Sequence, residues 1–159
     1  MSFIVEPIGY VRASRLHADD DFWGGEKARI ELVPAYSSDA LQGLAEFSHA
    51  EVLFVFHQVD EAKIVSSARH PRNNPNWPRV GIFAQRGKNR PNRIGSTICR
   101  ISEVQGTSLV VAELDAIDGT PVLDIKPVMQ ECLPREAVQQ PTWSRELMAQ
   151  YWLAKQGAK

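Results

Sequence analysis

The sequence predicts a mostly β protein, a small antiparallel β-barrel with peripheral helices and no Rossmann sheet. Short segments in which apolar and polar residues alternate recur along the chain, with turn signals between them, and only two stretches have helical spacing. Strands never alternate with long helices, which argues against a doubly wound α/β sheet. A chain of 159 residues suffices for one domain but not for two with separate cores. We therefore expect a single domain at 1–159, with a barrel core at about 4–130 and a C-terminal helix at about 142–155.

The first half of the chain contains three predicted strands and one short helix. The strands are Ile4–Arg12, Ala28–Leu32 and Glu51–Val59. The last of them is nearly all apolar and rich in β-branched and aromatic residues, which is typical of a central strand. Residues 40–47 have apolar side chains at helical spacing, and Ser37 or Ser38 can cap that helix.

The second half adds four predicted strands and a second helix. The strands are Val80–Ala84, Ile94–Val104, Ser108–Asp115 and Val122–Lys126. A hairpin turn at 105–107 joins two of them. Pro141 opens the helix, whose apolar stripe consists of Trp143, Leu147, Met148, Tyr151 and Trp152. This stripe either covers the barrel of its own subunit or contacts a second copy.

Positive charge is concentrated in one quarter of the chain. Residues Ala62–Ser102 carry nine Lys or Arg and no Asp or Glu, although the net charge of the whole chain is −1. Such a block is typical of a site for phosphate or a polyanion, with a solvated surface as the alternative. Trp77 and Phe83 lie in the same segment and offer aromatic faces on which a base could stack. We therefore expect an anionic partner.

Several common kinds of site are excluded by what the sequence lacks. It has no glycine-rich dinucleotide motif, no P-loop and no nucleophile elbow. The four histidines have no metal-binding spacing, so we expect no metal. Cys99 and Cys132 are too few for a disulfide framework, and neither a secretory signal nor a membrane-spanning run is visible. We expect a reducing, cytoplasmic setting and no membrane partner.

Polar and charged residues gather where predicted strands end. The stretch Phe83–Gly95 holds four basic residues that can bind phosphate or carboxylate, namely Arg86, Lys88, Arg90 and Arg93. The alternative is an exposed basic loop that binds no ligand. The stretch Leu114–Pro127 surrounds an ordinary Asp-Gly turn with further charges: Asp115, Asp118, Asp124 and Lys126. Charges beside buried strands are costly when unpaired, so these should pair with each other, with the basic loop or with a ligand.

His57 ends the longest apolar strand and is a candidate site residue for that reason. Pockets open at the ends of buried strands, and a polar ring there could line one. The alternative is an ordinary hydrogen-bonded or surface histidine.

Three motifs follow one another along the chain, FSHAEVLFVFH at 47–57, RPNRIG at 90–95 and LDAIDGTPVLDIKP at 114–127. In this order and at these separations they closely resemble the TsaA-like family, over about Ile8–Lys126. Its best-known members are tRNA methyltransferases that use S-adenosylmethionine to methylate N6 of threonylcarbamoyl-adenosine at position 37. The resemblance implies a small β-barrel, a homodimer and a cofactor near the dimer interface. It places these residues at the cofactor: His57, Gln58, Arg86, Leu114, Asp115, Ala116 and Ile117.

The same resemblance implies roles for the remaining polar residues. Methylation of an N–H nucleophile requires removal of its proton, which Asp115 or Asp118 could accept as the catalytic base. Contacts to RNA are expected from Lys88, Arg90, Asn92, Arg93 and Lys126. The alternatives are a methyltransferase acting on a small molecule or another nucleic acid, and a non-catalytic barrel that binds RNA or a nucleoside.

The sequence departs from the family pattern in three places. Arg93 stands where a proline usually follows the Asn of the RPN motif, so this loop has one more charge and less rigidity. The N-terminal cofactor loop is shortened, and Asp19–Trp23 lies in its region. The longer members continue with a C-terminal domain that we expect to help grip tRNA, whereas this sequence ends soon after one predicted helix.

Overall fold

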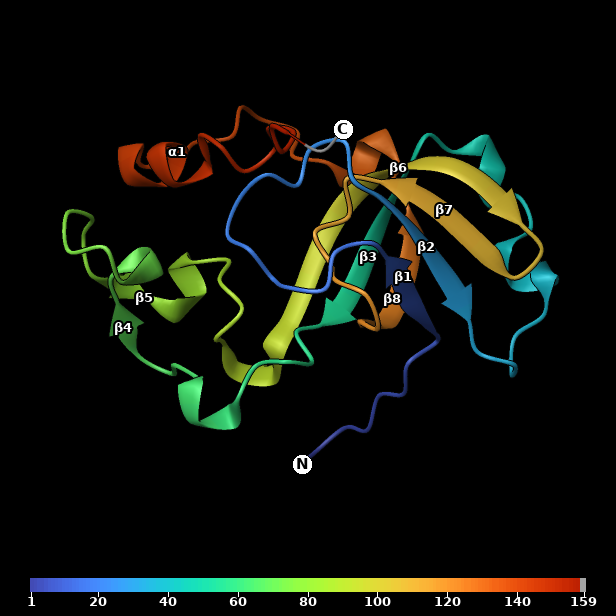
Figure 1. Ribbon diagram of the computed structural model, residues 1–159, viewed down its shortest axis with the longest axis horizontal. Coiled ribbons are helices and arrows are strands. Elements are labelled where there is room, and N and C mark those ends of the chain that lie inside the picture. The colour runs from blue at the N-terminus through green and yellow to red at the C-terminus, as the bar shows by residue number, and fades with distance from the viewer. Residues whose placement is uncertain (158–159) are drawn as a thin grey trace.

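Six antiparallel strands close into a barrel in the computed structural model, which describes residues 1–157 (Figure 1). Their order around the barrel is β1-β2-β7-β6-β3-β8. The strands are β1 (Gly9–Ala13), β2 (Lys27–Leu32), β3 (His49–Val55), β6 (Ile94–Gln105), β7 (Ser108–Ala112) and β8 (Pro121–Pro127). A separate two-stranded sheet consists of β4 (Ala68–Arg69) and β5 (Val80–Gly81). The predicted fold class, a mostly β barrel with few helices, is confirmed.

Alternate residues of each strand point into the barrel and form its core. In β3, Ala50, Val52 and Phe54 are buried while their neighbours are half-buried, so burial alternates along this strand although most of its residues are apolar. Phe54 packs directly on the backbone of Gly95 in β6, where a Cβ atom would lie 2.5 Å from the Phe54 ring. The glycine of the RPNRIG motif therefore has a packing role in the core.

The predicted strand ends are wrong where a strand lacks a partner or the backbone turns. Residues 4–8 lie outside β1, and Ile4 and Val5 are exposed, because β2 ends at Leu32, opposite Gly9. The strand predicted at Ser108–Asp115 is also shorter in the structure. Its equivalent, β7, stops at Ala112 because Glu113 has a positive φ of 65°.

One predicted helix and one predicted strand are each divided into two shorter elements. The helix at 37–47 is instead two 3₁₀ turns, η1 (Ser38–Leu41), capped by the Ser37 side chain, and η2 (Leu44–Glu46). Gly43, with a φ of 82°, separates them. The predicted strand at 80–84 divides into β5 and a 3₁₀ turn, η5 (Ile82–Ala84).

The C-terminal helix α1 (Thr142–Met148) is much shorter than the predicted 142–155. Tyr151 and Trp152 therefore lie beyond the helix, so the expected apolar stripe is not one helical face. The chain after α1 instead runs beside the β1–β2 loop, where Gly24 and Ala154 form a parallel bridge. Of the helices described at residues 1–157, none is long and apolar enough to cross a membrane.

The antiparallel order brings three long connections to the same end of the barrel. The C-terminal ends of β1, β3 and β7 and the N-terminal ends of β2, β6 and β8 must lie together, because each strand runs opposite to its neighbours. The connections at this end, which we name the site end, are residues 14–26, 56–93 and 113–120. In Figure 1, the longest of them carries β4 and β5 to the side of the barrel, near α1.

Candidate functional site

The site end brings together the polar segments that the three sequence motifs contain. His57 ends the first motif and follows β3. Residues 90–93 of the second motif, with Arg86 just before them, precede β6, and residues 114–117 of the third lie in the connection from β7 to β8. His57 also lies close to the Asp-Gly turn, since a Cβ atom on Gly119 would be 3.9 Å from its Nε2. Arg86 is tied to the start of β6 by a 2.7 Å hydrogen bond to the carbonyl oxygen of Ser96.

Lys126 does not join this group. It lies near the far end of β8, opposite Glu51 in the ladder, with its exposed ammonium group paired to Asp124. The hydrogen bond and charge of Asp124 raise the pKa of Lys126. The structure therefore separates Lys126 from the other predicted RNA-binding residues, which belong to the loop before β6.

Asp115 is hydrogen-bonded at the site end both to β6 and to the chain beyond α1. The first half of β6 pairs with β3 alone, because β7 pairs with β6 only from Arg100 onward. The segment after β7 passes this half of β6, where the buried Thr97 hydroxyl donates a hydrogen bond to Asp115 Oδ1. The Tyr151 hydroxyl, from beyond α1, donates to Asp115 Oδ2.

The charge of Asp115 affects two neighbouring groups that titrate. Burial, followed by the Asp115 charge, raises the pKa of the Cys99 thiol to about 12. The same two causes, with the hydrogen bond to Asp115, raise the pKa of the Tyr151 hydroxyl far above its ordinary value. The charges of Arg86 and Arg72 lower the pKa of Tyr151, but their effect is smaller. The phenol therefore stays protonated and serves as a hydrogen-bond donor at neutral pH.

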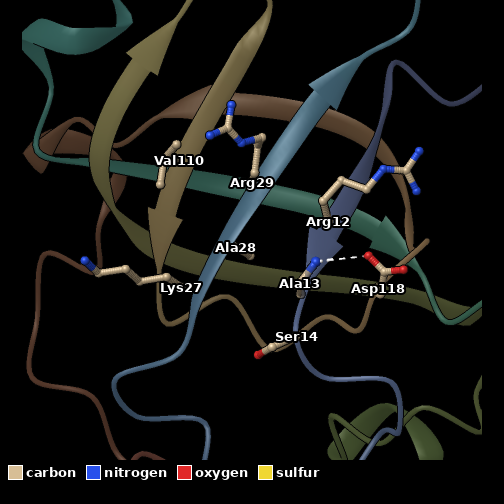
Figure 2. Close-up of a pocket in the computed structure, with 8 residues that line it drawn as sticks. All are labelled: Arg12, Ala13, Ser14, Lys27, Ala28, Arg29, Val110 and Asp118. Atoms are coloured by element: carbon tan, nitrogen blue, oxygen red, sulfur yellow. Dashed lines mark hydrogen bonds between the residues drawn. The ribbon is translucent and has the colours of Figure 1, made fainter.

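Asp118, the other predicted base, is bound to the backbone of β1 and the residues after it. Its Oδ1 accepts a 3.0 Å hydrogen bond from the Ala13 amide, and its own amide donates to the Arg15 carbonyl oxygen at 2.8 Å. Figure 2 shows this carboxylate beside the end of β1, at a shallow hollow of about 440 Å³ that is also lined by Arg12, Lys27 and Arg29. Asp118 is thus held by a backbone amide, whereas both donors to Asp115 are side-chain hydroxyls.

Removing the Asp118 carboxylate is expected to lower stability, whereas an amide should preserve it. Asp118→Ala leaves the Ala13 amide without its acceptor and should cost about 1 kcal/mol in the free energy of unfolding. Asp118→Asn retains an oxygen at the same position, so its free energy of unfolding should lie within about 0.5 kcal/mol of the wild-type value. Urea denaturation measures both. Equal stability of all three proteins would show that the hydrogen bond contributes nothing measurable.

The basic loop before β6 is anchored by its own positive side chains. Three of them donate to backbone carbonyl oxygens: Lys88 to Ala18 at 3.2 Å, Arg90 to Gln85 at 2.7 Å and Arg93 to Val59 at 3.1 Å. A neutral carbonyl does not cancel a cationic charge, and each guanidinium has five N–H donors, so donors remain for a ligand. The loop therefore presents ordered positive charge, although Glu61 lies 3.8 Å from Arg93.

The other predicted cofactor and RNA residues differ in what they can offer. Leu114, Ala116 and Ile117 are buried in the barrel, so their backbone groups, and not their side chains, are available to a ligand. Gln58 is exposed, and Asn92 is exposed with a positive φ of 61°. Their side chains are free to contact a ligand that enters from solvent.

Two arginines at the site end were missed by the sequence analysis. The buried Arg15 guanidinium stacks 3.9 Å from the Trp23 ring centroid and donates to the Phe22 carbonyl oxygen at 2.9 Å. Its Nη1 and the Nε of Arg69 are the buried side-chain nitrogens without a hydrogen-bond partner among residues 1–157. Nothing in the sequence separates these arginines from surface ones, because neither belongs to a motif. Thr97 and Tyr151 were missed for the same reason.

Comparison with known proteins identifies the family. The family model described as "tRNA-methyltransferase O N-terminal domain" matches residues 18–132, which is most of the chain. The chain belongs to this family. The match includes all three motifs, and it excludes α1 and Tyr151. The TsaA-like resemblance is thereby confirmed as membership of the TrmO family.

Individual relatives of the TrmO family agree with this assignment. A tRNA (adenine(37)-N6)-methyltransferase from Escherichia coli is 42% identical over 109 residues, which cover 65% of this chain and 46% of that protein. A Pyrococcus horikoshii protein named "Probable S-adenosyl-L-methionine-binding protein" is 30% identical over 141 residues, covering 87% of this chain and 92% of that protein. The crystal structure of TrmO from Pseudomonas aeruginosa matches with a TM-score of 0.73 at 29% identity, covering 90% of this chain and 62% of the other. The chain thus spans about half the length of the Escherichia coli methyltransferase and about three fifths of the Pseudomonas aeruginosa protein.

Proposed function

We propose that this chain is an S-adenosylmethionine-dependent methyltransferase that methylates N6 of threonylcarbamoyl-adenosine at position 37 of tRNA. The observation that carries the proposal is the meeting of the three family motifs at one end of the barrel. His57, the RPNR segment at 90–93 with Arg86 just before it, and Asp115 come from three separate connections, which the antiparallel topology brings to this end. Relatives of the chain are named as methyltransferases on adenine 37 of tRNA.

The residues at the site end fit the groups that S-adenosylmethionine carries. Its carboxylate requires cationic donors, and the unpartnered buried N–H groups of Arg15 and Arg69, together with Arg86, supply them. Its positive charges require an anion, and Asp115 has hydroxyl groups on both oxygens and, among residues 1–157, no cation bound to either. The buried 114–117 corner adds backbone donors and acceptors beside an apolar surface.

The residues of the chain would hold the acceptor and take its proton. The chemistry supplied by bound S-adenosylmethionine is a methyl group on a positively charged sulfur, whose neutral thioether leaving group needs no general acid. The acceptor nitrogen must lose its proton as the new N–C bond forms, and we assign that proton to the Asp115 carboxylate. Asp118 is the alternative base, and its Oδ1 accepts from the backbone amide of Ala13 at the hollow beside the end of β1. His57 and the apolar corner would shape the pocket and limit water.

The basic loop would supply attraction to RNA that does not depend on sequence. Lys88, Arg90 and Arg93 keep their charges and are fixed beside the site end by backbone hydrogen bonds. Asn92 is exposed between them and can contact a base or a phosphate. We also propose a homodimer and a cytoplasmic location, both of which remain predictions.

A second candidate function is cofactor binding without methyl transfer to tRNA. It is favoured by the Pyrococcus horikoshii relative, which this chain covers almost completely and whose name states only S-adenosylmethionine binding. The two candidates share a cofactor site and differ in the acceptor.

Cofactor binding is tested by calorimetry on the full chain with S-adenosylhomocysteine, the demethylated product. We expect a dissociation constant of micromolar order, roughly −8 kcal/mol. Arg86→Ala should weaken binding by about tenfold, because a charge-assisted donor is lost. Arg79→Ala is the matched control, since Arg79 is an exposed arginine of the same connection and should bind as the wild type does. Equal binding by Arg86→Ala and the control would remove Arg86 from the cofactor site.

The acceptor is tested separately, by mass spectrometry of tRNA nucleosides. Total tRNA from cells that lack this gene, incubated with the full chain and S-adenosylmethionine, should gain methylated threonylcarbamoyl-adenosine. Binding of S-adenosylhomocysteine together with an unchanged nucleoside profile would favour the second candidate over the first.

A further inference from the structure

Tyr151 belongs to a segment that the backbone of the chain anchors to the site end. Residues 150–154, which we name the C-terminal segment, lie along the β1–β2 loop. The Phe22 amide donates to the Gln150 carbonyl oxygen at 3.2 Å, and the Trp23 amide donates to that of Tyr151 at 2.8 Å. The Gly24 amide donates to the Leu153 carbonyl oxygen at 3.2 Å. These bonds fix the backbone of Tyr151 beside the first connection of the site end.

A second anchor lies just before the C-terminal segment in the sequence, where α1 contacts the longest connection of the site end. The Trp77 indole Nε1 donates to Glu146 Oε2 at 2.8 Å, which joins α1 to the segment between β4 and β5. Arg72 in that segment binds Asp21 through both of its terminal nitrogens at 2.9 Å, which joins it to the β1–β2 loop. Three parts of the chain that are distant in sequence are thus tied to one another around Tyr151.

The Tyr151 side chain completes the surroundings of Asp115. Thr97 holds one carboxylate oxygen from the barrel and Tyr151 holds the other from the C-terminal segment. Two donors on different oxygens fix both the position and the rotation of a carboxylate, whereas one donor leaves it free to turn. Because burial and the Asp115 charge raise the pKa of Tyr151, its hydroxyl keeps the proton that this contact requires.

We propose that Tyr151 is a positioning residue, whose hydroxyl holds the Asp115 carboxylate in the orientation that accepts the proton of the methyl acceptor. The inference rests on the proposed function and extends it to a residue outside the part of the chain that the family match covers. A carboxylate that turns away from the acceptor lowers the transfer rate, because small misplacements of reacting groups lower rates steeply, whereas its charge stays beside the cofactor and ligand binding is kept.

The substitution Tyr151→Phe tests this role with little disturbance to packing. It removes only the hydroxyl and keeps the ring that lies edge-on to Trp152 at 4.9 Å. The matched control is Tyr10→Phe, on the outer face of β1 and 37% exposed. With tritiated S-adenosylmethionine and tRNA from cells lacking the gene, Tyr151→Phe should lower kcat about tenfold. The KM for tRNA and the dissociation constant for S-adenosylhomocysteine should stay within about twofold of the wild type. The control should match the wild type in all three.

A double-mutant cycle separates positioning from general damage to the fold. If Tyr151 acts through Asp115, then Tyr151→Phe should change kcat by less than about twofold when Asp115 is already asparagine. Losses that multiply in the double mutant would show that Tyr151 acts independently of Asp115 and would overturn the inference.

The remaining outcomes are also decisive. An unchanged kcat in Tyr151→Phe would remove the positioning role and leave the proposed function intact. Binding of S-adenosylhomocysteine that becomes more than about fivefold tighter would mean that Tyr151 occupies the ligand's place and must leave before binding. A wild type that neither binds S-adenosylhomocysteine nor methylates tRNA would contradict the proposed function itself.

Discussion

Replacing Asp115 with asparagine is expected to lower the rate of methyl transfer by about 10² or more while the barrel remains folded. The amide has no basic oxygen that can take the acceptor's proton. It has nearly the shape of the carboxylate and can still accept from Thr97 or Tyr151, both of which are rotatable hydroxyl donors. The loss should therefore appear in kcat, measured by single-turnover methylation of tRNA, with little change in the urea midpoint.

The matched control for this prediction is Asp124→Asn. Asp124 is another half-buried carboxylate of the same motif, but it lies on β8 and pairs with Lys126, away from the site end. We expect it to retain wild-type turnover. If Asp115→Asn also retained turnover, Asp115 would hold ligands without taking the proton, and Asp118 would become the first candidate for the base.

The arrangement of the motifs could be predicted from the sequence because it follows from local patterns. Alternating apolar residues identified the strands of the barrel, and polar strings marked the places where strands end. The family resemblance placed His57, Arg86 and Asp115 at one cofactor site. Alternate strand ends of an antiparallel barrel share one side, and the connections that carry these three residues all lie at the site end. Lys126, which was expected to contact RNA, lies at the opposite end of its strand from this group, and its role stays a prediction.

The contacts that complete the site could not be predicted, because they depend on pairings between distant segments. Tyr151 was assigned to the apolar stripe of a long helix, and the helix ends at Met148. Its contact with Asp115 requires the C-terminal segment to pair with the β1–β2 loop, and no local periodicity encodes that pairing. Arg15 was missed because stacking on Trp23 leaves no trace in the spacing of residues.

The glycine at position 24 makes the pairing of the C-terminal segment possible, and its replacement with alanine should release the segment. A Cβ atom at Gly24 would overlap the carbonyl oxygen of Trp152 and lie 2.8 Å from the carbonyl carbon of Trp152 and 3.0 Å from that of Leu153. All three atoms belong to the backbone, so no change of side-chain rotamer relieves the overlap. The segment must move as a unit, and the hydrogen bond from Tyr151 to Asp115 should be lost with it.

We expect Gly24→Ala to destabilise the protein by about 2 kcal/mol, as overpacking at a closed contact does. Trypsin should also cut faster after Arg145 and Lys155, which flank the C-terminal segment and are exposed. The matched control is Gly81→Ala, because Gly81 has nothing within 4 Å of its Cβ position and no positive φ.

The same variant connects the packing of the C-terminal segment to catalysis. If Tyr151 positions Asp115, Gly24→Ala should lower kcat at least as far as Tyr151→Phe does. The double variant Gly24→Ala/Tyr151→Phe should then have the same kcat as Gly24→Ala alone. A Gly24→Ala protein whose C-terminal segment is cut faster by trypsin but whose kcat is normal would show that Asp115 works without its second donor. The carboxylate would then be held by Thr97 and the barrel alone.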